Sequence, residues 1–110
     1  MAFDEGLAHR LREALGDQAG LVEKKMFGGL AFMLSGNMCC GVVGEILMVR
    51  VGPGAHDEAL KRPHARPMDF TGRPLKGLIY VDPPGFESDG DLAGWVRQGV
   101  AFARSLPAKR

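Results

Sequence analysis

The hydrophobic pattern of the chain begins with a helical spacing. Phe3, Leu7, Leu11 and Leu15 recur at every fourth position, which is typical of one apolar stripe on a helix. Gly16 is a suitable residue to end this helix, because glycine adopts positive φ without steric cost. The spacing therefore predicts an N-terminal helix that packs one face against a core.

From residue 21 onward, the helical spacing gives way to four short apolar segments. They are separated by Gly28-Gly29, by Ser35-Gly36-Asn37 and by Gly44-Glu45. Glycine and asparagine accept positive φ, and connections of two or three residues are those of antiparallel hairpins. The pattern therefore predicts a four-stranded meander over residues 21–27, 30–34, 38–43 and 46–51.

A short helix and a fifth strand are expected in the middle of the chain. Pro53 and Gly54 introduce the helix over residues 55–61, and Pro63 must end it because proline cannot continue a helix. The apolar run over residues 78–81 is typical of a strand, since turn residues follow it directly.

The last part of the chain returns to helical spacing. Ser88, with Asp91 three positions later, resembles a capping box in which Asp replaces the usual Glu. Apolar residues then recur on one helical face as far as Leu106. Together the segments predict an α+β fold: an antiparallel β-meander of about five strands flanked by N-terminal and C-terminal helices. Because 110 residues is near the usual single-domain size, we expect one domain over residues 1–110.

The expected sheet is apolar on both of its faces. In the fourth strand, alternation puts Leu47 and Val49 on one face and both Ile46 and Met48 on the other. The second strand likewise carries Met33 on its second face. Either the chain's own helix or Pro-rich segment covers this second face, or the face binds a second copy or another protein. The candidate interface residues are Met33, Ile46 and Met48.

Residues 62–77 are rich in cations, proline and glycine. From Lys61 to Lys76 there are five Lys or Arg and one acid, Asp69, so the local charge is +4 while the whole chain carries +1. The prolines and glycines exclude a regular helix or a central strand. A loop of this kind is a candidate site for an anion, and equally an ordered structural connection.

An anion or nucleic-acid site would use the cations of this loop and of the neighbouring strands. A pI of about 7.8 and a single Trp and a single Tyr for base stacking weigh against it. The alternative is that these side chains are solvated or bind backbone carbonyls. Arg50 interrupts an apolar strand. It therefore either marks the solvent-exposed end of the strand or pairs with an acid such as Asp69. The candidate residues are Lys24, Lys25, Arg50, Arg62, His64, Arg66, Arg73 and Lys76.

The chain's two cysteines, Cys39 and Cys40, are adjacent on the third expected strand. Strand neighbours point to opposite faces, so one metal ion cannot easily bind both. A disulfide between neighbours would strain the backbone. We expect two free, buried thiols that behave as small hydrophobes, and a redox role is the remaining alternative.

The chain carries no recognisable catalytic or cofactor motif. No serine lies in a G-x-S-x-G elbow, no glycine-rich phosphate loop is present, and nothing in the sequence brings Cys40 to His64 as a nucleophile and base. The longest apolar runs fall short of the roughly 18 to 20 residues of a membrane span, and the N-terminus does not resemble a signal peptide. We expect a cytoplasmic, non-enzymatic protein with no cofactor, metal or membrane partner.

Four segments also carry a family resemblance. They are residues 24–29 at the first hairpin, 47–51 in the fourth strand, and 67–70 before 75–81. In order and spacing they resemble the N-terminal domain of the TfoX/Sxy family, named after bacterial regulators of competence-gene expression. This resemblance runs over about residues 3–106.

The resemblance implies a bacterial, non-enzymatic α+β domain with no cofactor or catalytic residue to carry over. The full regulators carry a second, C-terminal helical domain, whereas this chain stops at Arg110. We therefore expect a stand-alone form of the domain, acting as a protein-interaction or regulatory module. A homodimer or another protein is its expected partner, and a role in competence does not follow from the resemblance alone.

Overall fold

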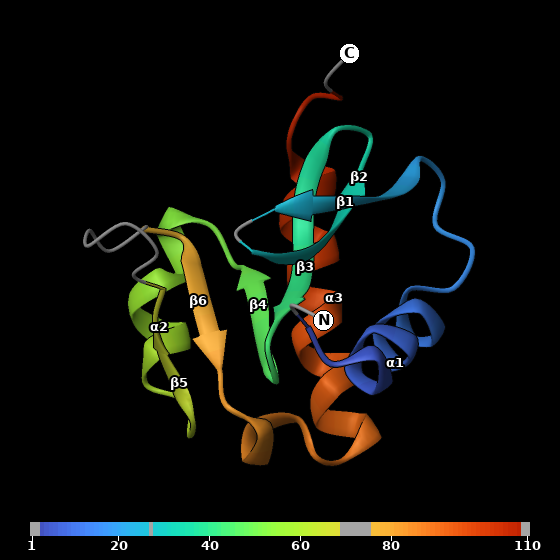
Figure 1. Ribbon diagram of the computed structural model, residues 1–110. Coiled ribbons are helices and arrows are strands. Elements are labelled where there is room, and N and C mark those ends of the chain that lie inside the picture. Colours follow the sequence, from blue (N-terminus) through green and yellow to red (C-terminus); the bar gives the residue numbers. More distant parts are fainter. Residues whose placement is uncertain (1–2, 27, 69–75, 109–110) are drawn as a thin grey trace.

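The computed structural model describes residues 3–26, 28–68 and 76–108, which form three α-helices, six strands and two short 3-10 turns (Figure 1). None of the described helices combines the length and apolar content needed to cross a bilayer. In chain order the elements are α1 (Glu5–Leu15), β1 (Leu21–Met26), β2 (Gly29–Leu34), β3 (Asn37–Val43), β4 (Ile46–Arg50), η1 (Pro53–Ala55), α2 (His56–Leu60), β5 (Ala65–Pro67), β6 (Leu78–Val81), η2 (Pro83–Phe86) and α3 (Asp89–Ser105).

The six strands form one antiparallel sheet in the order β1-β2-β3-β4-β6-β5. The first four strands are the predicted meander, and their bounds agree with the expected ones to within a residue. The strand β6 returns beside β4, where Met48 lies opposite Tyr80. The predicted α+β class, with helices at both ends of the strands, is therefore confirmed.

The strand β5 lies within the basic segment and was not predicted. It occupies the edge of the sheet, where its Pro67 faces Ile79 of β6. Proline is tolerated at an edge because its missing N–H can face away from the ladder. The sequence argument against a central strand therefore holds, and the sheet has six strands rather than about five.

Both long helices begin at a capping side chain; the sequence indicated the one of α3, whereas Asp4 of α1 was missed. The side chain of Asp4 accepts a hydrogen bond from the N–H of Gly6 at 2.9 Å, and Gly16 ends α1 with φ of 60°. At the start of α3, Ser88 Oγ accepts from the N–H of Asp91 at 3.0 Å, as the capping pattern predicts.

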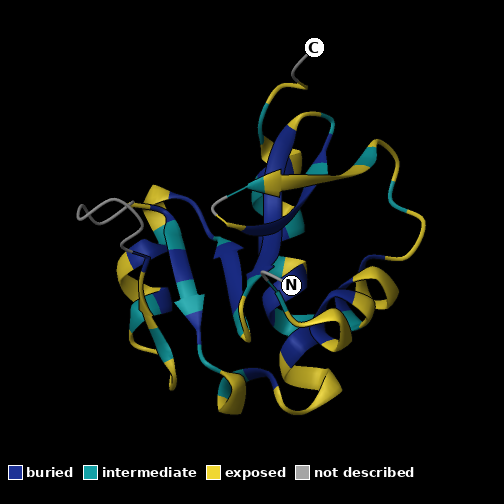
Figure 2. Cartoon of the chain, in the orientation of Figure 1, coloured by how far each residue is buried: buried dark blue, intermediate teal, exposed yellow. Residues whose placement is uncertain are grey.

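The main core lies between the sheet and the helices, which all pack on one face of it. It includes Leu11 of α1, Ala59 of α2 and Trp95 of α3, and all three are buried. The long helix α3 runs behind the strands in Figure 1, and the central strands are buried along most of their length (Figure 2). On this face, the predicted alternation of β4 is confirmed because Leu47 and Val49 belong to the main core.

A bulge in β3 corrects the expectation for the two cysteines. Pairing with β2 steps from Phe32–Cys40 to Met33–Met38, so Cys39 is an extra residue in the ladder. Both cysteines therefore belong to the main core, with their sulfur atoms 3.8 Å apart. The strict alternation that would separate them does not apply at a bulge. Both are free and buried, as expected.

Candidate functional site

The sheet face opposite the helices carries a second, smaller hydrophobic cluster. Its buried members are Ala31, Met38, Met48 and Met68. Half-buried residues pack around them: Met26, Met33, Val43, Leu78 and Tyr80. We call these nine residues the methionine face. Among the described residues it contains no helix residue, so no helix of the described chain seals this side.

The basic, Pro-rich segment contributes to covering the methionine face. Met68, the residue after β5, is fully buried in the cluster together with Met48. Of the three predicted interface residues, Met48 therefore lies beneath the surface with no exposed area. Met33 and Ile46 remain half-buried and reachable from outside. The chain itself therefore buries the centre of this face and leaves its surroundings accessible.

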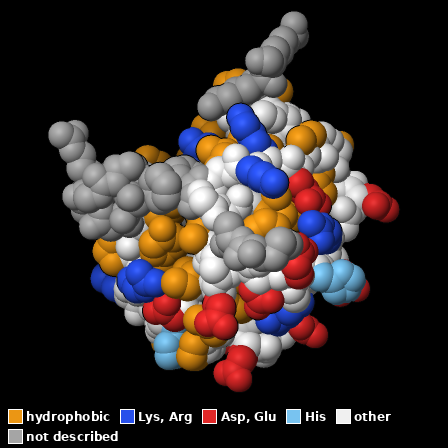
Figure 3. Space-filling model, viewed as in Figure 1, with side chains coloured by type: hydrophobic (Ala, Val, Ile, Leu, Met, Phe, Trp, Pro, Cys, Tyr) orange, Lys and Arg blue, Asp and Glu red, His pale blue; other side chains and the backbone are white. Residues whose placement is uncertain are grey.

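The accessible part of this face extends onto β1. Val22 is the one large hydrophobic side chain among the described residues that is markedly exposed, at 60%, and it lies opposite Met33 in the ladder. Alternation along β1 puts Val22, Lys24 and Met26 on the same side. Hydrophobic side chains gather over β6 in Figure 3, with Lys and Arg side chains on either side of them.

Two of the predicted cations bind aromatic rings of α3 rather than forming an open anion site. The guanidinium of Arg50 lies over the ring of Phe102, 5.2 Å from its centroid. That of Arg62 lies over Trp95 at 3.4 Å and donates to Gln98 at 3.1 Å. The sequence allowed two interpretations of Arg50: it marks the solvent-exposed end of the strand, or it pairs with an acid such as Asp69. Arg50 is the last residue of β4 and is half-buried, which agrees with the strand-end interpretation, and its guanidinium also makes the cation–π contact. Asp69 lies outside the described residues.

Arg66 is also engaged within the chain. It donates from Nε to both carboxylate oxygens of Asp82 at 3.1 Å, and its guanidinium lies over Tyr80 at 4.9 Å. Asp82 follows β6 directly, so this pair fastens the edge strand β5 to its neighbour. Because both side chains are well exposed to solvent, the ion pair adds only modestly to stability.

The other predicted cations lie apart from one another. Lys24 and Lys25 are exposed on β1, where strand alternation points them to opposite faces, and Lys76 is exposed just before β6. His64 is exposed and has φ of 68°, which is uncommon for a residue other than glycine. Arg73 lies outside the described residues. The structure therefore does not bring the described members of the predicted basic set together at one place.

Arg62 and His64 do share one surface pocket, of about 380 Å³. It lies between the α2–β5 connection and the start of α3, and Asp91 and Trp95 also line it. Burial lowers the pKa of Arg62, and the charge of Asp91 acts in the opposite direction. An arginine keeps its charge in either case. This pocket thus holds a stacked cation next to a carboxylate, which is a poor site for a bare anion.

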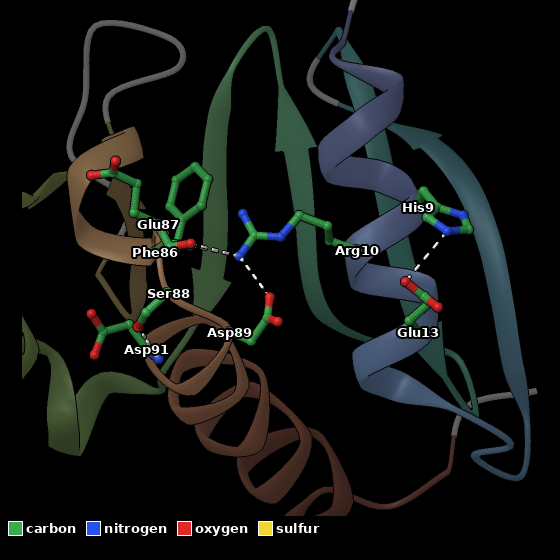
Figure 4. A network of polar contacts seen from close by, with 8 residues as sticks. All are labelled: His9, Arg10, Glu13, Phe86, Glu87, Ser88, Asp89 and Asp91. Carbon is green, nitrogen blue, oxygen red and sulfur yellow. Dashed lines mark hydrogen bonds and ion pairs between the residues drawn. The ribbon is translucent and has the colours of Figure 1, made fainter.

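A second polar cluster, centred on Arg10, was missed by the sequence reasoning (Figure 4). Arg10 of α1 donates from Nη2 to the backbone oxygens of Phe86 at 2.9 Å and of Glu87 at 3.2 Å. It also contacts Asp89 Oδ1 at 3.3 Å. These bonds join α1 to the η2–α3 junction, so Arg10 works as a structural clamp. A polar residue on the outer side of a helix gives no sequence signal of this contact.

The residues that the structure describes assemble no metal site. No three His, Cys, Asp or Glu side chains converge there on a point where they could hold a metal ion. The adjacent thiols lie under α3, and the pKa of Cys40 is raised by its hydrogen bond with Cys39 and by burial. A thiol with a raised pKa is a weak nucleophile at neutral pH.

The fold and its surfaces define a small α+β domain in which the described helices cover one face of the sheet and leave the other uncovered. Comparison with protein families identifies the family of this domain: residues 13–103 match the family described as the TfoX N-terminal domain. The chain therefore belongs to the TfoX N-terminal domain family, as the resemblance in the sequence suggested. No curated protein matches the chain. No solved structure matches it either.

Proposed function

We propose that this domain is a non-enzymatic protein-interaction module of a regulatory system, and that it binds its partner through the methionine face. One observation carries the proposal: five methionines gather on the side of the sheet that no described helix covers. Methionine is unbranched and polarizable, so a surface rich in it can repack against an incoming apolar side chain. Accessible apolar faces of this kind are typical of protein interfaces.

The partner that suits this face is an apolar segment flanked by acidic residues. Lys24 lies between Val22 and Met26 on the same side of β1, and Lys76 is exposed two residues before Leu78. The acid nearest to Lys24 along the chain, Glu23, is turned to the other side and bound by Arg12 at 2.7 Å. Glu45, in the β3–β4 turn, is an exposed acid near the end of these strands. Negative charge on the partner would therefore be favourable at the two lysines.

The regulatory part of the proposal rests on membership of the TfoX N-terminal domain family. A role in transcription control, in the cytoplasm, is what the family resemblance implies. A non-enzymatic role agrees with the scattered titratable groups described above. Nucleic-acid binding is the weaker alternative, because Arg50, Arg62 and Arg66 are all engaged within the chain.

Methyl-labelled methionine allows a direct test by NMR. The probe is an amphipathic peptide of Leu and Glu, compared with one of the same pattern made of Leu and Lys. We expect the Leu/Glu peptide to shift the methyl signals of Met26 and Met33, because these side chains are half-buried and reachable. The indole signal of Trp95 on the other face should stay in place. Binding is expected in the high micromolar range or weaker for so small a surface.

A charge reversal on the face provides the matched variant. Lys24→Glu should weaken binding of the Leu/Glu peptide several-fold and strengthen that of the Leu/Lys peptide. Arg97→Glu, at an exposed position on α3, is the control and should change neither. If neither peptide moves a methionine methyl signal of the folded domain, or if Trp95 responds instead, the methionine face is not the binding surface.

A further inference from the structure

The strand β1 presents an open backbone edge. It is the first strand of the sheet order and has six residues, of which Val22 through Lys25 are exposed. Within the described residues, nothing pairs with its outer side. The opposite edge, β5, has only three residues and includes Pro67, which cannot donate to a ladder. A further strand can therefore add to this sheet at β1 but not readily at β5.

The hydrogen bonds at the start of the β1–β2 hairpin show which groups of β1 point outward. Ser35 donates to the oxygen of Gly20 at 3.1 Å, in step with the β1–β2 register, so this pair is a hydrogen-bonded one. Every second residue from Gly20 then bonds to β2. The N–H of Leu21 accordingly donates to Gln18 and not to β2. The backbone groups of Glu23 and Lys25 therefore face the open edge.

The sequence of β1 is self-complementary about Lys24. In an antiparallel pair of two β1 strands with Lys24 opposite its own copy, Glu23 lies opposite Lys25 and Val22 lies opposite Met26. Each of these pairs occurs twice, once on each side of the twofold axis. Glu23 and Lys25 are also the residues whose backbone groups point outward, so they form the hydrogen-bonded pairs. Opposite charges and apolar side chains each stabilise such cross-strand pairs.

We propose that two copies of this chain associate through β1 in this register, which joins their sheets into one continuous antiparallel sheet. The twofold axis passes midway between the two Lys24 residues at right angles to the sheet, so both methionine faces point the same way. Val22, otherwise the most exposed large apolar side chain of the described residues, is then covered by Met26 of the second copy. This contact lies along the β1 edge and shares Val22, Lys24 and Met26 with the surface proposed above for a partner, so the two would compete there.

Two features limit the strength of the association. Lys24 meets its own copy, and like charges directly opposite are unfavourable. Charged residues on an edge strand also discourage pairing with unrelated strands. In this strand the charges also select the register, because Glu23 and Lys25 lie opposite each other, and so attract, in only one antiparallel register. A five-residue pairing buries less than the roughly 1,000 Å² of a stable interface, so the dimer is expected at tens to hundreds of micromolar protein.

Cysteine cross-linking tests the register. Residues facing each other in a non-hydrogen-bonded antiparallel pair have Cα atoms about 4.5 Å apart, which suits a disulfide. Lys24→Cys should therefore form a covalent dimer under mild oxidation. Val22→Cys, on the same side of β1, is the matched control. It should not cross-link, because its two copies are roughly 14 Å apart. The native Cys39 and Cys40 are fully buried and do not interfere.

A charge exchange tests the pairing independently in sedimentation experiments with the uncross-linked protein. Lys25→Glu places two acids opposite each other and should weaken dimerisation by at least several-fold. Adding Glu23→Lys also removes the ion pair with Arg12 of the same chain, but it restores opposite charges between the copies, with their positions exchanged, and should recover the dimer. Lys24→Thr should tighten it by removing the like-charged pair. A wild-type chain that stays monomeric at several hundred micromolar overturns the proposal, and so does cross-linking of Glu23→Cys in place of Lys24→Cys.

Discussion

The two faces of the sheet are buried by different means, although both are apolar. On the helix-covered face, aromatic and branched side chains such as Phe32, Leu47 and Trp95 pack against three helices and are almost entirely inaccessible. On the other face, methionines fill most of the space and Met68 supplies the covering from a short segment after β5. The first face is a fully buried core. The second face has a buried centre, and the residues around it are only half-buried.

Under the proposed function, this difference separates stability from binding within one small domain. Branched and aromatic side chains have few rotamers, so they define one packing arrangement well. Methionine tolerates changes in its surroundings and adapts to irregular gaps. A face built from it can therefore admit a partner without disturbing the helix-covered side. The expected results below measure how far the two faces are independent, beginning with the largest effect.

Phe32→Ala should produce the largest loss of stability, because it opens a cavity in the helix-covered core. Phe32 has no exposed surface, and substitutions of this kind cost about 3–5 kcal/mol. Urea denaturation of the wild-type and variant domains measures the difference. A cost below about 1 kcal/mol would mean that this core relaxes as readily as the methionine face, and the contrast between the faces would disappear.

Met48→Ala and Met33→Ala compare the buried centre of the methionine face with its accessible surroundings. Met48 is fully buried, so its truncation should cost about 2–3 kcal/mol. Met33 is half-buried, and its truncation should cost less than about 1 kcal/mol. The same denaturation measurement checks both. Equal losses for the two variants would show that the face behaves as a sealed core and would count against a binding role.

The smallest expected effect concerns the ion pair that ties α1 to β1 on the helix-covered side. Hydrogen bonds from Arg12, at 2.7 and 2.9 Å, lower the pKa of Glu23. A carboxyl whose folded pKa is lowered stabilises the fold at pH above its unfolded value, about 4.3, and loses this contribution as pH falls through the folded pKa. Glu23→Gln should therefore be less stable than wild type at pH 7, with the gap closing below about pH 4.

The magnitude at pH 7 should be at most a few tenths of a kcal/mol, because the Glu23 side chain is 37% exposed and solvent screens the pair. Stability measured against pH in low salt gives the comparison, and 1 M salt should shrink the gap further. A gap that widens toward acid pH would reverse the assigned sign and contradict the role given to this pair.

Local sequence features predicted most of the fold correctly. The four-residue spacing of α1, the Ser88 cap of α3 and the glycine-rich hairpin turns depend on interactions within a few residues, so they are visible in the sequence. The edge strand β5 was missed because three residues with a proline carry no strand pattern of their own. Only the neighbouring strand β6 provides the partner that makes them a strand.

The candidate site was predicted in part. Alternation along β4 placed Met48 on the second face correctly, but it could not show that Met68 comes back to bury Met48. The basic residues were grouped because they are close in sequence and similar in charge. Their side chains instead find separate partners, Phe102, Trp95 and Asp82, which lie far away along the chain.

The sequence by itself determined the α+β class, the positions of the three described helices and of every described strand except β5, the family and the presence of a second apolar sheet face. These follow from local propensity and periodicity, which act over short stretches of chain. Only the tertiary structure decided that both cysteines share one core, that Arg10 clamps α1 to the start of α3, and that the methionine face is covered by Met68 and no described helix. Each of these depends on contacts between residues distant in sequence, where neither spacing nor composition specifies which side chains meet.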